Sequence, residues 1–270
     1  NTAGGVENVA VGNYALDALT SGDSNTAVGH QALGANTTAG NNAAFGANTL
    51  DANTTGQYNT AVGSNSLSTN STADHNTAVG RSALALNSTG AKNQAIGSGA
   101  LYSNLASHNT AVGWNALNAN TTGTSNVAVG NYALTANTTG NYNVALGYAA
   151  SLVSTDATMN VVIGYDAGKT IDSGGSNVVN GFEAAMLGTT MSANVVIGHR
   201  AARAITTADS NTIVGYNAAL GITTGSSNTI IGTNAGELGV RLTTGARNTL
   251  VGHKPHTSAA DSVDQIVMGF

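Results

Sequence analysis

A five-residue motif recurs along the chain at a nearly constant spacing, and this repeat limits the possible folds more than any other feature. The motif reads Asn, any residue, two residues that are almost always apolar, and Gly. Thirteen of its fifteen intervals are 17 residues, one is 16 and one is 20. Such a period indicates stacked structural repeats. The sixteen copies begin at Asn8, Asn25, Asn42, Asn59, Asn76, Asn93, Asn109, Asn126, Asn143, Asn160, Asn177, Asn194, Asn211, Asn228, Asn248 and Gln265.

The content of one repeat favours strands and turns over helices. Counting the motif Asn as position 0, positions 1 to 3 are rich in Val, Thr and Ile, and Gly stands at position 4. In a typical early copy, such as the one that begins at Asn126, the apolar pair Ala-Leu follows at positions 7 and 8, and Asn-Thr-Thr-Gly stands at positions 11 to 14. Seventeen residues with frequent Gly are too few for a helix pair. We expect an all-β parallel β-solenoid, or β-roll, of about sixteen coils, each with two short strands.

The two fixed residues of the motif need separate explanations. Gly at every strand end indicates a positive φ or a close backbone approach. Asn at position 0 can form a side-chain ladder with its equivalents in neighbouring coils, or can simply suit a turn, and both interpretations stay open. The structural repeat residues are represented by Asn25, Gly29, Asn59, Gly63, Asn126, Gly130, Asn194 and Gly198. The 16-residue interval reflects a deletion near Leu105 and Ala106, and the 20-residue interval an insertion around 237–242; we expect turns to absorb both.

Both faces of the predicted strand at positions 1 to 3 avoid charge. Position 2 is always apolar, and position 3 is apolar in every copy except the one with Asn180. Side chains at these two positions point to opposite faces, and a solenoid coil has one interior. The second apolar face therefore needs a cover, which we expect to be further copies of the same chain in an elongated homotrimeric fibre.

The apolar residues change in type along the chain. Position 2 is Ala through Ala145 and is then Val, Ile or Leu, while position 8 changes from Leu to small residues such as Gly168. Position 11 changes from Asn to residues such as Ile171. Because cores conserve volume, we interpret these changes as compensating fillings of one interior. We expect coils of an Ala/Leu type over 1–142, and coils of a Val/Ile type over 143–270 that continue the same solenoid.

Composition excludes several classes of function. The chain has no Cys, which removes disulfides and thiolate chemistry. It has 8 Lys and Arg residues and a net charge of −5, so we expect no nucleic-acid partner. No apolar run reaches the length of a membrane span, so we expect no membrane insertion.

The repeat Asn-Thr-Ala-Val-Gly-x-x-Ala-Leu-x-x-Asn-Thr-Thr-Gly-x-x resembles the tandem repeats of phage and phage-like tail fibres. Over Asn8–Phe270 it also resembles, more distantly, the head repeats of trimeric autotransporter adhesins, which have another period. The resemblance implies a homotrimeric structural protein that mediates host attachment. It places the chain in a virion tail fibre or on a cell surface, with other fibre or baseplate proteins and a surface glycan or protein receptor as partners. No segment resembles the chaperone domain that often follows tail-fibre repeats, nor a membrane anchor, so we expect a fragment or processed product.

Candidate receptor contacts occur at position 5, just after the motif Gly. Aromatic rings there can stack on sugars, or can pack across subunits. The six His and thirteen acidic residues show no recurrent catalytic or metal-binding pattern, although His253 and His256 could hold an ion. We therefore expect no enzyme activity, no cofactor and no metal. The aromatic candidates are Trp114, Tyr148, Tyr165, Phe182 and Tyr216.

Two further hypotheses concern the exterior. Thr recurs at positions 1, 12 and 13, as in β-solenoids that bind ice, so an ice-binding protein is an alternative to the fibre. Six of the eight basic residues follow Asn160, which favours that half for contact with an anionic glycan.

Overall fold

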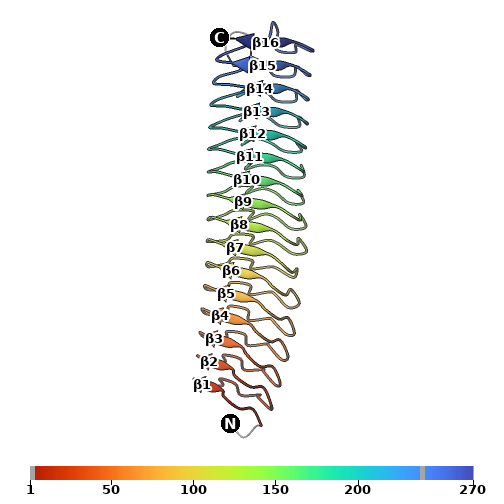
Figure 1. Ribbon diagram of the computed structural model, residues 1–270. Helices are drawn as coiled ribbons and strands as arrows, with labels where there is room; N and C mark the ends of the chain where they lie inside the picture. Colours follow the sequence, from red (N-terminus) through yellow and green to blue (C-terminus); the bar gives the residue numbers. More distant parts are fainter. Residues whose placement is uncertain (1–3, 238–240, 270) are drawn as a thin grey trace. The chain divides into compact units, whose positions relative to one another are not determined.

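The computed structural model describes residues 4–237 and 241–269, and in that part the chain is an all-β parallel solenoid with no helix. The solenoid prediction is confirmed. The chain divides into two compact units, Asn1–Tyr132 and Ala133–Phe270. In Figure 1 the strands of each unit are stacked in chain order, with one strand per coil. The boundary at 142 remains a prediction.

The first unit contains strands β1 to β8. Each strand pairs in parallel with the next, and each residue lies beside the residue at the same repeat position, as Ala27 lies beside Ala44. The strands are Val9–Val11 (β1), Thr26–Val28 (β2), Ala43–Phe45 (β3), Thr60–Val62 (β4), Thr77–Val79 (β5), Gln94–Ile96 (β6), Thr110–Val112 (β7) and Val127–Val129 (β8). The short interval leaves this register unchanged, since Gln94 of β6 lies beside Thr110 of β7. A turn absorbs the deletion, as predicted.

The second unit contains strands β9 to β16 in the same parallel arrangement. They are Val144–Leu146 (β9), Val161–Ile163 (β10), Val178–Asn180 (β11), Val195–Ile197 (β12), Thr212–Val214 (β13), Thr229–Ile231 (β14), Thr249–Gly252 (β15) and Ile266–Gly269 (β16). Thr229 of β14 lies beside Thr249 of β15, so the register also survives the long interval. Residues 238–240 of that predicted insertion lie outside the described residues.

The expected second strand at positions 7 and 8 is wrong. These residues lie in turns, and the side chain at position 8 is buried although its residue has a left-handed backbone. In the second coil φ is +55° at Gln31 and +51° at Leu33, which is incompatible with an extended strand. The backbone N–H of Leu33 still donates to Thr49 O of the next coil at 3.0 Å. Turns therefore stack through hydrogen bonds without strand geometry.

The interior of each coil is filled from positions 2, 7, 8 and 11. The position 2 side chain points inward and is fully buried from Ala27 to Leu250, with one value of 1% at Val162. In the tenth coil, a methyl group added to Gly168 at position 8 would lie 3.2 Å from Val162 and 2.7 Å from Ile171. These three positions border one space, so larger residues at positions 2 and 11 fill the volume that Leu occupies in the first unit. This contact supports the interpretation that the changes at positions 2, 8 and 11 compensate for one another in volume.

The motif Asn forms a ladder in both units. Within each unit, every backbone N–H at position 0 donates to the Oδ1 atom of the equivalent Asn one coil earlier, at 2.9–3.1 Å. The Nδ2 group of Asn59 donates to Ala73 O within its own coil at 2.9 Å. Of the two interpretations of this Asn, the ladder is the one observed.

A second ladder, at position 11, was not foreseen in the sequence. In the first unit these Asn residues are buried, and Asn70 Nδ2 donates to Asn53 Oδ1 at 2.8 Å and to Ala73 O at 3.0 Å. All of these Asn residues except Asn104 also begin an Asn-x-Thr sequence. Because their amides are buried and hydrogen-bonded, they are not accessible acceptors for glycosylation.

The motif Gly is required for both of the predicted reasons. Gly29 has a φ of +137°, and a Cβ atom there would lie 2.3 Å from Gly46 O of the next coil. Gly198 has a φ of +135° and the same close approach, at 2.3 Å, to Gly215 O. Any side chain would force neighbouring coils apart at this corner.

Candidate functional site

The outer face of the strands is uncharged and partly exposed in a single chain, with apolar residues at position 3, except for Asn180, and mostly Thr or Val at position 1. It consists of the side chains at positions 1 and 3, and none of these positions carries a charged residue in any of the sixteen coils. Away from the first and last coils, the exposed large side chains at position 3 are 36–43% accessible. We call the position 3 side chains the strand-face stripe. Its exposed members are Val11, Phe45, Val62, Val79, Ile96, Leu146, Ile163, Ile197, Ile231 and Met268.

Four of the five predicted receptor contacts belong to one stack of rings in the second unit. His199 lies between Phe182 and Tyr216, and the adjacent ring centroids are 5.0–5.3 Å apart with interplanar angles of 8–12°. The four aromatic rings other than His199 remain about half exposed. Coil-on-coil stacking therefore explains the position 5 pattern within a single chain, and receptor contact by these residues stays a prediction. The order of the stack is Tyr148, Tyr165, Phe182, His199 and Tyr216.

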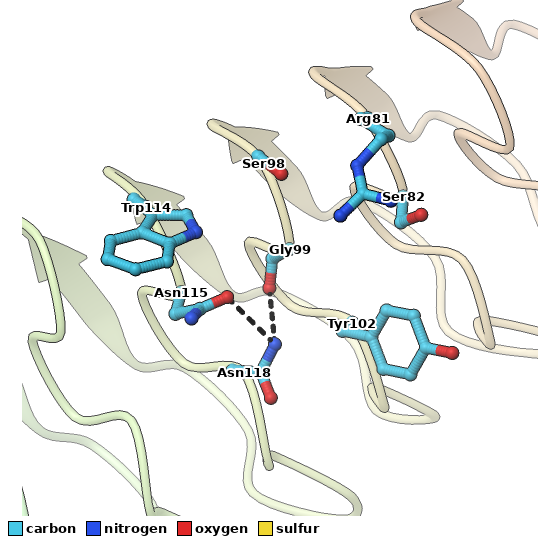
Figure 2. Close-up of a pocket in the computed structure, with 8 residues that line it drawn as sticks. All are labelled: Arg81, Ser82, Ser98, Gly99, Tyr102, Trp114, Asn115 and Asn118. Atoms are coloured by element: carbon cyan, nitrogen blue, oxygen red, sulfur yellow. Dashed lines mark hydrogen bonds between the residues drawn. The ribbon is translucent and has the colours of Figure 1, made fainter.

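Trp114, the fifth predicted contact, belongs to the first unit. Its ring lies 4.8 Å from that of Tyr132 at an angle of 58°, and 48% of the residue is exposed. Trp114 is also the single tryptophan of the chain. It forms one wall of an open groove of about 470 Å³ over the fifth to seventh coils, which Figure 2 shows. The groove is lined by Arg81, Ser82, Ser98, Gly99, Tyr102, Trp114, Asn115 and Asn118.

The groove exists because small residues interrupt the row of side chains at positions 5 and 6. Arg81, Ser98 and Trp114 occupy position 5 in successive coils, and Gly99 follows Ser98 at position 6. The far wall is fixed by Asn118, whose Nδ2 group donates to Gly99 O at 2.8 Å and to Asn115 Oδ1 at 3.4 Å (Figure 2). Sequence reasoning identified Trp114 but missed the groove, although two adjacent small residues at outward positions were a readable signal.

Basic residues in the second half of the chain are mostly paired with acids. Five ion pairs occur within the described ranges, and four involve Lys169, Arg200, Arg203 and Arg241, with Arg247–Asp264 as the fifth. The pairing neutralises most of the positive charge that suggested an anionic glycan there. The Arg81 side chain has no ion pair or hydrogen bond to any described residue.

Three of the paired carboxylates have shifted pKa values: those of Glu183 and Asp264 are lowered, and that of Glu237 is raised. Burial acts to raise the pKa of Glu183, but hydrogen bonds and charge from Arg203 and Arg200 outweigh it, so the pKa is lowered. Burial raises the pKa of Glu237, and this effect exceeds the opposing effects of the Gly221 N–H and Arg241. The arginine partners explain the Glu183 shift, and burial explains the Glu237 shift.

Comparison with protein-family models gave no match for this chain, and comparison with curated proteins gave none either. The function must therefore be argued from the residues themselves.

The remaining residues can be compared with the requirements of metal binding and of membrane insertion. Across residues 4–237 and 241–269, no three His, Asp or Glu side chains gather closely enough to hold a metal ion. His253 and His256 are both exposed at a bend in the fifteenth coil, where His256 Nδ1 lies 3.1 Å from Thr257 O. In the same described ranges, no helix is long and apolar enough to cross a bilayer.

The Thr residues at position 12, which suggested ice binding, are used within the solenoid. The hydroxyl of Thr54 donates to Ser71 O of the next coil at 3.0 Å, and that of Thr206 donates to Thr223 O at 3.1 Å. These hydroxyl groups donate hydrogen bonds to carbonyl oxygens of the next coil, so their protons are not available to bind ice.

Proposed function

We propose that this chain is a structural attachment protein that works as a homotrimer, with the strand-face stripes of three copies turned toward a common axis. The observation that carries the proposal is the stripe itself, a recurrent apolar row on a face without charge. Large exposed apolar patches on soluble proteins mark interaction surfaces. A partner that covers such a row over many coils must repeat at the coil spacing, and another copy of this chain has that spacing.

The energetics favour a long contact over a short one. Covering a partly exposed Val or Ile contributes roughly 1 kcal/mol, a fraction of the value for complete burial. Association costs about 4–15 kcal/mol in lost translational and rotational freedom, so one or two coils cannot hold copies together. The eight strands of either unit offer enough side chains to exceed that cost.

The biological setting follows from the likeness of the repeat to phage and phage-like tail fibres. In that setting the chain is a stiff part of a virion fibre, joined to other fibre or baseplate proteins, that presents its outer faces to a host-cell glycan or protein. A bacterial trimeric adhesin head is the alternative. The coil-to-coil Asn ladders support a role as a stiff element, because each coil is fixed to its neighbour by buried amides.

Introducing negative charge on the strand-face stripe tests the proposal. Substituting Val62→Asp, Val79→Asp and Ile96→Asp together places three carboxylates on the strand face, where assembly would have to bury them. The variant is expected to be monomeric by light scattering, while circular dichroism shows that its strands remain.

A matched control carries three carboxylates on another face. Thr38→Asp, Thr55→Asp and Thr72→Asp lie at position 13, where all three residues are exposed, and this variant is expected to assemble like the parent chain. If the stripe variant and the parent chain had the same mass, the stripe would not be the contact between copies.

A further inference from the structure

We propose that the groove between Arg81 and Trp114 binds an acidic saccharide, with one sugar ring against the Trp114 indole and a carboxylate at the Arg81 guanidinium. The inference specifies the attachment part of the proposed function by naming a ligand class and a site. It uses residues at positions 5, 6 and 9, which lie beyond the Gly corner and not on the strand-face stripe.

The dimensions of the groove fit a sugar. Arg81 and Trp114 occupy the same repeat position two coils apart, and neighbouring strands lie about 4.8 Å apart, so the two side chains are separated by roughly 10 Å. Ser98 and Gly99 fill little of the space between them. Figure 2 shows the Trp114 indole at one end of the groove and the Arg81 guanidinium at the other, with Tyr102 nearer to the Arg81 end.

The chemistry of the walls favours a ring with one apolar face and polar edges. Trp114 and Tyr102 are 48% and 37% exposed, which leaves aromatic surface for contact with the C–H face of a pyranose. The Ser98 hydroxyl lies between the ends and the Ser82 hydroxyl lies beside Arg81 (Figure 2), and both can bond to sugar hydroxyls. The hydrogen bonds of Asn118 to Gly99 and Asn115 hold the wall in place before a ligand binds.

Arg81 determines the charge of the ligand. Its guanidinium lacks a protein partner among the described residues, unlike the five paired bases of the second unit. A guanidinium matches a carboxylate with two parallel hydrogen bonds. The net charge of −5 disfavours a polyanion, so a saccharide with an isolated carboxylate fits better than a highly sulfated chain.

Tryptophan fluorescence tests the site directly, because Trp114 is the single tryptophan. The full chain is titrated with a glucuronate-containing tetrasaccharide, and in parallel with the same tetrasaccharide after reduction of its carboxylates to alcohols. We expect a saturable change in emission with the acidic sugar and at least tenfold weaker binding of the reduced one.

Two variants examine the walls separately. Arg81→Gln is expected to weaken binding of the acidic sugar at least tenfold and to leave binding of the reduced sugar unchanged. Ser98→Tyr fills the groove and is expected to abolish binding. This variant should fold, because Tyr occupies position 5 at Tyr148, Tyr165 and Tyr216. Tyr142→Ala, at an exposed position in the second unit, is the control and should bind as the parent chain does.

An unchanged emission with the acidic tetrasaccharide, equal affinity for the reduced one, or full binding by Ser98→Tyr would overturn the proposal. The outcome is separate from that of the trimer. A monomeric chain that binds would keep the groove and reject the assembly, and a trimer that does not bind would do the reverse.

Discussion

At the scale of the residue, buried amides carry much of the specificity of this protein. A carbonyl oxygen and an amide group on one side chain let each Asn accept from the coil after it and donate within its own coil. Apolar residues of similar volume would fill the same space but would leave backbone groups without partners. Repetition of Asn at position 0 thus follows from the backbone groups that the coil leaves unpaired.

Asn59→Ala tests this account. The substitution removes the acceptor for the Asn76 N–H and the donor to Ala73 O, and both groups are buried. Each buried group that loses its partner costs about 1–3 kcal/mol, so we expect a loss of about 2–5 kcal/mol in the free energy of unfolding. Urea denaturation measures it. Asn13→Ala, at an exposed position, should change the stability by less than about 0.5 kcal/mol; equal effects of the two substitutions would refute the role of the ladder.

A second residue-scale prediction concerns pH. Glu183 Oε2 accepts from Arg203 Nε at 2.8 Å and from Arg200 Nε at 3.0 Å. Because the folded state lowers the pKa of Glu183, its contribution is complete above pH 4.5, its ordinary value, and disappears as pH falls through the lower folded value.

We therefore expect Glu183→Gln to destabilise the chain by roughly 1 kcal/mol at pH 7, and the difference from the parent chain to vanish in acid. Melting curves recorded between pH 7 and pH 3 give the comparison. Asp156→Asn, at an exposed position, is the control. A difference that stayed constant as the pH fell from 7 to 3 would contradict the assignment of this stability to the ionised carboxylate.

At the scale of the element, the coil is one strand followed by stacked turns. The strand at positions 1 to 3, its inward position 2 and the Gly corner could all be predicted, because alternation and the steric demand of a corner are visible in sequence. The turn at positions 6 to 8 could not, since Leu33 and its equivalents adopt a left-handed backbone that Leu usually avoids. The surrounding coils impose that conformation, and a single repeat gives no sign of it.

The candidate site could also be predicted only in part from the sequence. Trp114 could be identified because aromatic residues at an outward position are visible in the sequence. Ser98 and Gly99 mark a gap that the sequence shows, but the groove and its walls could not be predicted, because they depend on which outward positions of three coils adjoin, and positions 6 and 9 become neighbours only through the turn. The stacking of rings from Tyr148 to Tyr216 likewise requires the side chains of neighbouring coils to be aligned.

The interior of the coil gives an element-scale prediction. Gly168→Leu keeps a backbone that Leu adopts elsewhere, since φ is +48° at Gly168 and +50° at Leu134. The added side chain collides with Ile171 and Val162, so we expect a loss of about 1–3 kcal/mol or more. Adding Val162→Ala and Ile171→Ala, which reproduces the small residues of the first unit at position 2, should recover stability.

Urea denaturation of the single, double and triple variants gives their free energies of unfolding, and from these the coupling energy between position 168 and positions 162 and 171. The two Ala substitutions without Gly168→Leu serve as the control, and they should be destabilising because they leave a cavity. Purely additive free energies would contradict the shared interior.

At the scale of the whole molecule, the main question is what covers the strand-face stripe. The interior of each unit is complete within one chain, since the position 2 side chains are buried without a partner. The stripe is an exposed apolar row that recurs in both units. In the proposed trimer the copies meet through this outer face.

The most direct test is the mass of the purified chain by multi-angle light scattering during size-exclusion chromatography, repeated over a dilution series. The account predicts a particle of about 80 kDa, three copies of the 26.6 kDa chain, that persists to low micromolar concentration. A well-folded particle of 26.6 kDa at all concentrations would contradict it.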